Sequence, residues 1–209
     1  MKPLFDDTLF QKKVLCLDIS EDGHYLLAGY KNGLLVLWDS AKFRKALTMT
    51  DVAKTAASDF AAVKILFIND DKVITIVTAE ECGRIRLVHV TKSFMGGFSH
   101  KANSLYETDL VGAATISVLV PSNLPCHYSP FCDTSCVTAF GATNQISIVE
   151  MKSWPPRPIK TIVRPAVCKE KSVPLITFGY GLTPCERERT LPLMAYAWDK
   201  VVQIMFINE

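Results

Sequence analysis

The sequence predicts an all-β fold, a β-propeller of about four blades, each a four-stranded antiparallel sheet. Short apolar segments alternate with turn residues along the chain, and third strands of the recurring pattern begin near residues 34, 84, 145 and 201. The spacing is therefore about 50 to 60 residues, and four short strands at such a spacing are typical of a propeller blade. No long segment shows the helical period that would compete with this interpretation.

The first blade has the clearest pattern. Its predicted strands are VLCLDIS (14–20), YLLAGY (25–30), LLVLWD (34–39) and KALTMT (45–50). Asn32-Gly33, between the second and third, suits a two-residue type I′ turn, because both central positions need a positive φ angle that Asn tolerates and Gly adopts freely. Residues 14–50 are therefore predicted to form a meander of up to four antiparallel strands.

The pattern then recurs in more degenerate form. The further predicted strands are 62–70, 72–80 and 84–90 in the second blade, 115–121, 136–142, 145–151 and 157–163 in the third, and 173–181, 191–198 and 201–208 in the fourth. Within 84–90, Ile85 and Leu87 alternate with Arg84 and Arg86, which predicts one core face and one wet face. We expect a partial propeller over residues 1–209, with blades at approximately 12–50, 60–105, 110–165 and 172–209.

The segments between these strands are predicted to be loops. They are 58–62, 95–104, 121–135 and 183–189, and the Ala-rich stretch 51–64 is either a short helix or a strand-linking loop. Propellers close with ~4–8 blades. Because this chain supplies about four and stops after a third strand, we expect an incomplete ring that belongs to a longer protein.

Composition and charge narrow the class of protein. The chain is 49% hydrophobic and 21% charged, with a formal net charge of +2, so we expect a packed core and no nucleic-acid partner. Asp6 and Asp7 lie in the N-terminal segment, where a secretory signal peptide would have an uninterrupted apolar region. No segment approaches the ~20 consecutive apolar residues that span a bilayer. These features predict a soluble chain facing the cytosol, and its seven scattered cysteines do not suggest a disulfide framework.

The first blade resembles a WD repeat, with a strand ending in Gly-Tyr, an Asn-Gly turn and a strand ending in Trp38-Asp39. It lacks an upstream Gly-His, and Asn32 stands where an Asp often completes the hydrogen-bond network of that repeat. Trp198-Asp199 falls elsewhere in its blade, at the end of a second strand, so the two Trp-Asp pairs are not copies of each other. The pairs therefore indicate architecture and not a repeated site.

Three segments carry a narrower resemblance. They are GYKNGLLVLWD (29–39), VTKSFMGG (90–97), and SVPLITFGYG (172–181) followed by LPLMAYAWDKVVQIMFI (191–207). In this order they resemble the propeller of the vacuolar protein sorting-associated protein 8 family. The resemblance extends diffusely over nearly the whole chain.

That resemblance implies a subunit of an endosomal vesicle tethering complex, acting in protein transport to the vacuole or lysosome and in membrane fusion. It implies protein partners, namely sister tethering subunits and an early-endosomal Rab GTPase. It also implies a cytoplasmic location, peripheral on endosomes, with membrane association indirect through partners. It brings no catalytic residues, no cofactor and no metal. The alternative is a generic WD-repeat scaffold of another multiprotein assembly.

A zinc- or thiol-dependent activity around Cys126–Cys136 is the less favoured alternative. Cys126, His127, Cys132 and Cys136 form the densest group of possible metal ligands, but their spacing lacks the paired cysteines usual in zinc sites. Cys16 lies within an apolar strand, where a small core residue is expected. We therefore expect a protein that is not an enzyme.

Binding is the favoured class of function, because propellers present loops on a rigid scaffold. The expected contact segments are the long loops 95–104, 121–135 and 183–189. The charged residues CERERT (185–190) suit either ionic contacts at an interface or a solvated loop.

Overall fold

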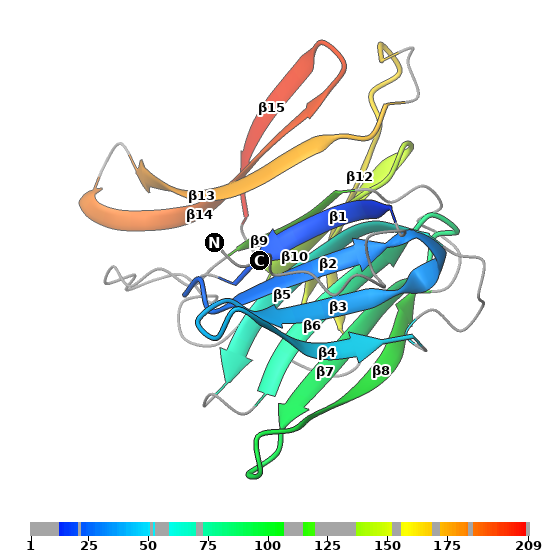
Figure 1. Ribbon diagram of the computed structural model, residues 1–209. Helices are drawn as coiled ribbons and strands as arrows, with labels where there is room; N and C mark the ends of the chain where they lie inside the picture. The colour runs from blue at the N-terminus through cyan, green and yellow to red at the C-terminus, as the bar shows by residue number, and fades with distance from the viewer. Residues whose placement is uncertain are drawn as a thin grey trace. The chain divides into compact units, whose positions relative to one another are not determined.

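The computed structural model describes residues 13–20, 22–50, 52, 59–69, 73–106, 115–119, 137–151, 156–168, 172–183 and 186–207. These residues form antiparallel β-sheets joined by turns, and a 3-10 turn covers Lys31–Gly33 (Figure 1). The chain divides into two compact units, Met1–Gly112 and Ala113–Glu209, each described by itself below. No helix among the described residues is long and apolar enough to cross a membrane. The all-β prediction is confirmed.

The first sheet of unit 1 matches the predicted meander. Its strands pair in the order β1-β2-β3-β4, and they are β1 (Val14–Ile19), β2 (Tyr25–Tyr30), β3 (Leu35–Asp39) and β4 (Arg44–Met49). Asn32 and Gly33 both have positive φ angles, 66° and 72°, as predicted. The connection is one residue longer than expected: the Tyr30 N–H donates to the Leu34 carbonyl at 2.8 Å and closes a three-residue loop.

The second sheet has four strands where only three were predicted. It has the order β5-β6-β7-β8, with β5 (Phe60–Asn69), β6 (Val73–Glu80), β7 (Ile85–Lys92) and β8 (Phe98–Tyr106). The prediction of a loop over 95–104 is therefore wrong from Phe98 onward, and 58–62 is a strand from Phe60 onward. The strand β8 was not predicted, because its sequence FSHKANS is polar. Its formation depends on pairing with β7 and on the packing of Phe98 against Tyr25.

Unit 2 contains a four-stranded and a three-stranded sheet. The first has the order β12-β11-β10-β9, with β9 (Thr115–Leu119), β10 (Val137–Gly141), β11 (Gln145–Glu150) and β12 (Arg157–Val163). The second comprises β13 (Leu175–Thr183), β14 (Glu186–Trp198) and β15 (Val201–Phe206). The predicted loop over 183–189 is wrong, because 183 ends β13 and 186–189 begin β14 in one long hairpin.

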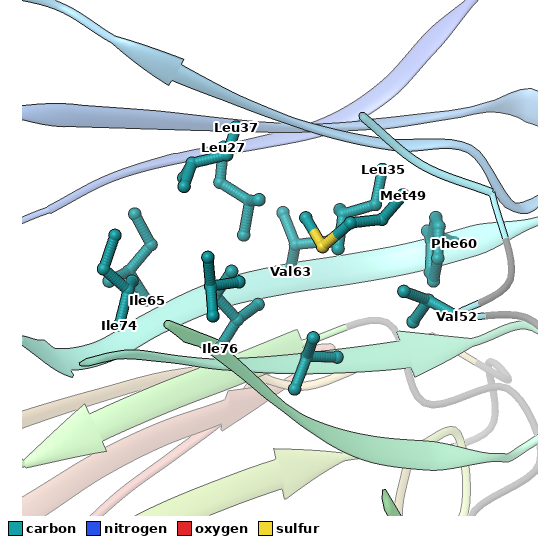
Figure 2. Packing of buried hydrophobic residues seen from close by; sticks show 12 residues of the cluster. Leu27, Leu35, Leu37, Met49, Val52, Phe60, Val63, Ile65, Ile74 and Ile76 are labelled. Carbon is teal, nitrogen blue, oxygen red and sulfur yellow. The ribbon is translucent and has the colours of Figure 1, made fainter. Parts of the chain in front are cut away.

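The core of unit 1 lies between its two sheets. Leu27, Leu35 and Leu37 of the first sheet point toward Val63 and Ile65 of β5 (Figure 2). Each of these five side chains is less than 9% exposed, and burying one aliphatic side chain contributes about 1.5–3 kcal/mol. The opposite face of the first sheet carries a second buried cluster, formed by Ala28, Tyr30, Leu34, Val36 and Trp38.

A corresponding core in unit 2 joins residues of its two sheets. It contains Val137, Ala139, Ile146 and Ile148 of the four-stranded sheet and Met194, Tyr196 and Trp198 of β14. Tyr196 and Trp198 meet edge to face, with ring centroids 6.0 Å apart. Both units therefore bury apolar residues between two neighbouring sheets, as stacked propeller blades do.

Small residues mark an equivalent position near the end of the second strand in every sheet: Gly29, Ala79, Gly141 and Ala197. A Cβ added at Gly29 would lie 2.6 Å from the Cys16 sulfur and 3.2 Å from Phe60 Cβ. One added at Gly141 would lie 2.8 Å from Pro174 Cγ and 2.9 Å from Ile176 Cδ1. In each unit a glycine thus permits close approach of the innermost strand of the next sheet.

Candidate functional site

The two Trp-Asp pairs have different structural roles, as predicted. Trp38 and Asp39 end β3, where the Asp39 carboxylate accepts the Lys42 N–H at 3.0 Å and lies 3.5 Å from Lys42 Nζ. Trp198 ends β14 with a fully buried ring, and Asp199 occupies the following turn with a φ angle of 49°. Trp38-Asp39 thus lies at the end of a third strand and Trp198-Asp199 at the end of a second strand.

Asp18 links β1 and β5, the first strands of the two sheets of unit 1. Its carboxylate accepts a hydrogen bond from the Lys64 ammonium at 2.6 Å and another from the Ile65 N–H at 2.7 Å. The Asp18 side chain is 10% exposed, so this pair is screened less than a surface ion pair. The contact fixes β1 against β5 and thereby the packing of the two sheets.

Asp59 forms a second link, at the start of β5. Its carboxylate accepts the Asn32 N–H at 2.7 Å, and its carbonyl accepts the Glu81 N–H at 3.1 Å. The β2–β3 turn of one sheet and the β6–β7 turn of the other are therefore both tied to one residue. Asn32 takes part in this network through its backbone.

A buried ion pair in the second sheet overturns one sequence prediction. Arg86 was expected on a wet face, yet it is 3% exposed and its Nε donates to Glu80 Oε1 at 2.6 Å. Glu80 is fully buried, and Cys82 donates its S–H to the other carboxylate oxygen at 3.6 Å. Both faces of β7 are covered at this point, which the alternation of apolar and basic residues could not reveal.

The described thiols differ in burial and in hydrogen-bond partners. Burial raises the pKa of Cys16 to about 11, against a smaller lowering by a backbone hydrogen bond at Gly29, so this thiol is protonated at neutral pH. Its S–H donates to the Phe60 carbonyl at 3.7 Å, and the small core residue expected here is confirmed. Cys168 is buried with its S–H directed at the Trp198 carbonyl, and Cys82 is exposed.

Cys126, His127, Cys132 and Cys136 lie outside the described residues. Within the described residues, no three His, Cys, Asp or Glu side chains are grouped in a way that could hold a metal ion. The zinc interpretation therefore stays an untested alternative.

The predicted contact loops have different outcomes. The loop 121–135 lies outside the described residues, and 183–189 is largely strand. Of 95–104, only the beginning is a turn, between β7 and β8. That turn exposes Phe94 and Met95 almost completely, at 107% and 95%.

Other titratable side chains on unit 1 have local partners. Burial by itself raises the pKa of Asp22. Hydrogen bonds from the Ser20 hydroxyl and the His24 N–H, together with the charge of His24, lower this pKa by more, so the net shift is downward. Burial, and secondarily the charge of Lys101, lowers the pKa of His89, whose Nδ1 lies 3.4 Å from the Thr75 hydroxyl. These groups stabilise turns and strand pairs and are not arranged for proton transfer.

Comparison with known proteins decides the family. The Vps8 beta-propeller family matches residues 4–209. The chain belongs to this family. The resemblance drawn from GYKNGLLVLWD, VTKSFMGG and the C-terminal strands is thereby confirmed, and the sheets described above are those of a Vps8-type propeller. No curated protein matches the chain.

Solved structures agree on the fold alone. A protein of unknown function from Desulfotomaculum acetoxidans DSM 771 is 11% identical with a TM-score of 0.56, and the alignment covers 94% of this chain and 52% of that one. The WD40 domain of SCAP from fission yeast is 12% identical with a TM-score of 0.58, over 93% of this chain and 40% of that one. The chain thus spans about half the length, or less, of these proteins.

Proposed function

We propose that this chain is a protein-interaction scaffold within a subunit of an endosomal vesicle tethering complex, acting in protein transport to the vacuole or lysosome and in membrane fusion. The observation that carries the proposal is the match to the Vps8 beta-propeller family over residues 4–209. The partners proposed are sister tethering subunits and an early-endosomal Rab GTPase. The location proposed is cytoplasmic and peripheral on endosomes.

The structure supports a scaffold by the way its sheets are fixed to each other. In unit 1, Asp18 and Asp59 join neighbouring sheets through hydrogen bonds of 2.6 to 3.1 Å, and a continuous apolar core lies between them. A surface held in this way loses little conformational entropy when a partner binds. Turns at the strand ends are then the natural contact elements.

We propose no catalytic role. Among the described residues, Cys16 has a thiol pKa of about 11, and Cys168 is buried against a carbonyl oxygen. The Cys16 thiol is therefore protonated at neutral pH and is a poor nucleophile. A binding function requires none.

The test is nucleotide-dependent capture. Early-endosomal Rab proteins, immobilised with a non-hydrolysable GTP analogue or with GDP, are incubated with the full-length subunit and, separately, with residues 1–209. We expect retention of the full-length subunit on the GTP form, with sister subunits co-purifying. Equal retention on both nucleotide forms would count against the GTPase part of the proposal, and failure of sister subunits to co-purify would remove the tethering part.

A WD-type scaffold of another assembly is the alternative, because fold likeness at 11–12% identity identifies no partner. Purification of the full-length subunit from its own cells separates the two. Stable association with tethering subunits supports the first, and association with another complex supports the second. Metal analysis of the purified chain tests the zinc alternative at 126–136, which absence of bound zinc would remove.

A further inference from the structure

Two hairpin turns of unit 1 display large apolar side chains to solvent. Each joins the third to the fourth strand of its sheet: Ser40–Phe43 between β3 and β4, and Ser93–Gly97 between β7 and β8. Phe43 is 73% exposed at the first turn, and Phe94 and Met95 are nearly fully exposed at the second. Each turn thus exposes at its tip an aromatic side chain that could be buried only against another molecule.

The second turn is ordered by its own hydrogen bonds. The Ser93 N–H donates to the Gly97 carbonyl at 2.7 Å, and the Gly96 N–H donates to the Ser93 carbonyl at 2.9 Å. Gly96 has a φ angle of 82°, a conformation that a residue with a side chain rarely adopts. Phe94 and Met95 are therefore held outward by a defined backbone geometry.

The first turn is fixed in a similar way. The Phe43 N–H donates to the Ser40 carbonyl at 3.3 Å, and Ser40 is itself bonded to the β1–β2 turn through Gly23 and His24. Phe43 has a φ angle of 49°, unusual for an aromatic residue. A strained conformation that exposes a phenyl ring is a feature from which function can be inferred.

Both turns lie at the same end of unit 1. Tyr25 pairs with Asp39, the last residue before the first turn, and Phe98 pairs with Lys92, the last residue of the strand before the second. The rings of Tyr25 and Phe98 touch edge to face, with centroids 6.4 Å apart. Figure 1 agrees, with the β7–β8 turn lowest in the view and the β3–β4 turn on the same side of the unit.

Basic residues flank both tips. Lys42, Arg44 and Lys45 surround Phe43, and all three are exposed. Lys92 precedes the second turn, and residues 84–106, which include the whole β7–β8 hairpin, contain no Asp or Glu. The described acidic side chains at this end, Asp22 and Asp39, are engaged locally with His24 and Lys42.

We propose that this surface, termed the tip surface (Phe43, Phe94 and Met95 with Arg44 and Lys92), inserts its apolar side chains into the interface of an anionic membrane. Apolar side chains that enter the acyl boundary, surrounded by cations at headgroup level, form the usual design of a peripheral membrane contact. A bilayer suits two separate small tips better than a protein pocket does, since a protein hot spot is typically one contiguous patch. Direct contact of this kind would add to membrane association through partners.

The first test uses vesicle flotation with the chain of residues 1–209 and no GTPase, so its outcome is independent of the proposed tethering partners. Vesicles contain phosphatidylcholine alone or phosphatidylcholine with phosphatidylserine. We expect binding to the anionic vesicles that weakens as salt is raised. We expect it to fall roughly tenfold in F94S/M95S, because exposed apolar groups gain this order of affinity on burial.

Matched control variants distinguish insertion of the tip surface from nonspecific hydrophobic binding to vesicles. Val202 and Ile204 of β15 are also exposed apolar residues, 70% and 69%, so V202S/I204S should leave binding unchanged. K92Q should weaken binding roughly fivefold, as expected for one cation near an anionic surface, whereas K160Q on β12 should not. Phe94→Trp is a probe of insertion depth: brominated lipids should quench its fluorescence more than that of the unchanged chain, which has three tryptophans.

Several results would overturn the proposal. These are equal binding of F94S/M95S and the unchanged chain, equal loss in V202S/I204S, or a Trp at position 94 that brominated lipids do not quench. If the folded chain, with unchanged circular dichroism, binds no anionic vesicles at all, the membrane contact is refuted and a protein pocket becomes the remaining occupant for the tips.

Discussion

The buried pair of Glu80 and Arg86 gives the sharpest prediction about the fold. Arg86 Nε lies 2.6 Å from Glu80 Oε1, and the side chains are 4% and 0% exposed. In Arg86→Met the carboxylate would stay buried, and among the described residues the weak S–H donor of Cys82, at 3.6 Å, would be its remaining side-chain partner. Removing one partner of such a pair costs about 3–5 kcal/mol of unfolding free energy, because the other charge is left without compensation.

The double variant Glu80→Met/Arg86→Met should recover most of that loss. Replacing both charges by apolar groups removes the desolvation cost together with the attraction, and such exchanges are often close to neutral. We therefore expect a double variant within about 2 kcal/mol of the unchanged chain, far from the sum of the two single changes.

These free energies are measured by urea unfolding, which is monitored by tryptophan fluorescence. The chain has three tryptophans, and changing Trp154 and Trp198 to Phe leaves Trp38 as the reporter of unit 1. The control is Arg157→Met, whose pair with Glu150 has a similar 2.8 Å separation but a side chain that is 56% exposed. Followed by Trp198 in a chain with Trp38 and Trp154 changed to Phe instead, it should cost less than about 1 kcal/mol. A cost below about 1 kcal/mol for Arg86→Met, or additivity in the double variant, would refute the reasoning.

Four further predictions follow from the contacts of unit 1. Gly29→Ala should destabilise by about 1–3 kcal/mol in urea unfolding, because its Cβ would lie 2.6 Å from the Cys16 sulfur; an unchanged midpoint would contradict the close approach. Asp18→Ala should cost about 1–3 kcal/mol by the same assay, and a loss no larger than that of an exposed Asp would show that the link is weak. Because the pKa of His89 is lowered in the folded state, the unfolded chain binds the proton first as pH falls; stability is intact above about pH 6.5 and declines below it, and His89→Gln should flatten that decline. An identical acid limb in the variant would exclude His89 as its source. Alkylation at neutral pH, mapped by mass spectrometry, should modify exposed Cys82 well before Cys16, and the reverse order would contradict the pKa of about 11.

The sequence predicts local pairing well where turn chemistry and apolar alternation coincide. Asn32-Gly33 is the clearest case, since its positive φ angles follow from the residues themselves. The polar strand β8 could not be predicted in this way, because its sequence FSHKANS does not favour a strand by itself. The strand is stabilised by pairing with β7 and by the contact of Phe98 with Tyr25. Local propensity is overruled there by tertiary packing.

Long-range polar contacts could not be predicted. Asp18 and Lys64 are 46 residues apart, and neither has a neighbour in sequence that indicates a link. Arg86 looked solvent-facing because a strand pattern does not tell whether the second face of a sheet is covered by another element. The exposed tips at Phe43 and Phe94 also have no sequence signal, since single surface aromatic residues are ordinary until a structure shows how far they project.

Hydrogen exchange of the full-length subunit with an early-endosomal Rab GTPase, loaded with a GTP analogue or with GDP, tests the proposed scaffold function most directly. We expect the GTP form alone to slow exchange in residues 1–209, in turns and strand ends, while the hydrogen-bonded strand centres stay unchanged. Identical exchange in the two nucleotide states, with the protein folded and the GTPase active, would contradict it.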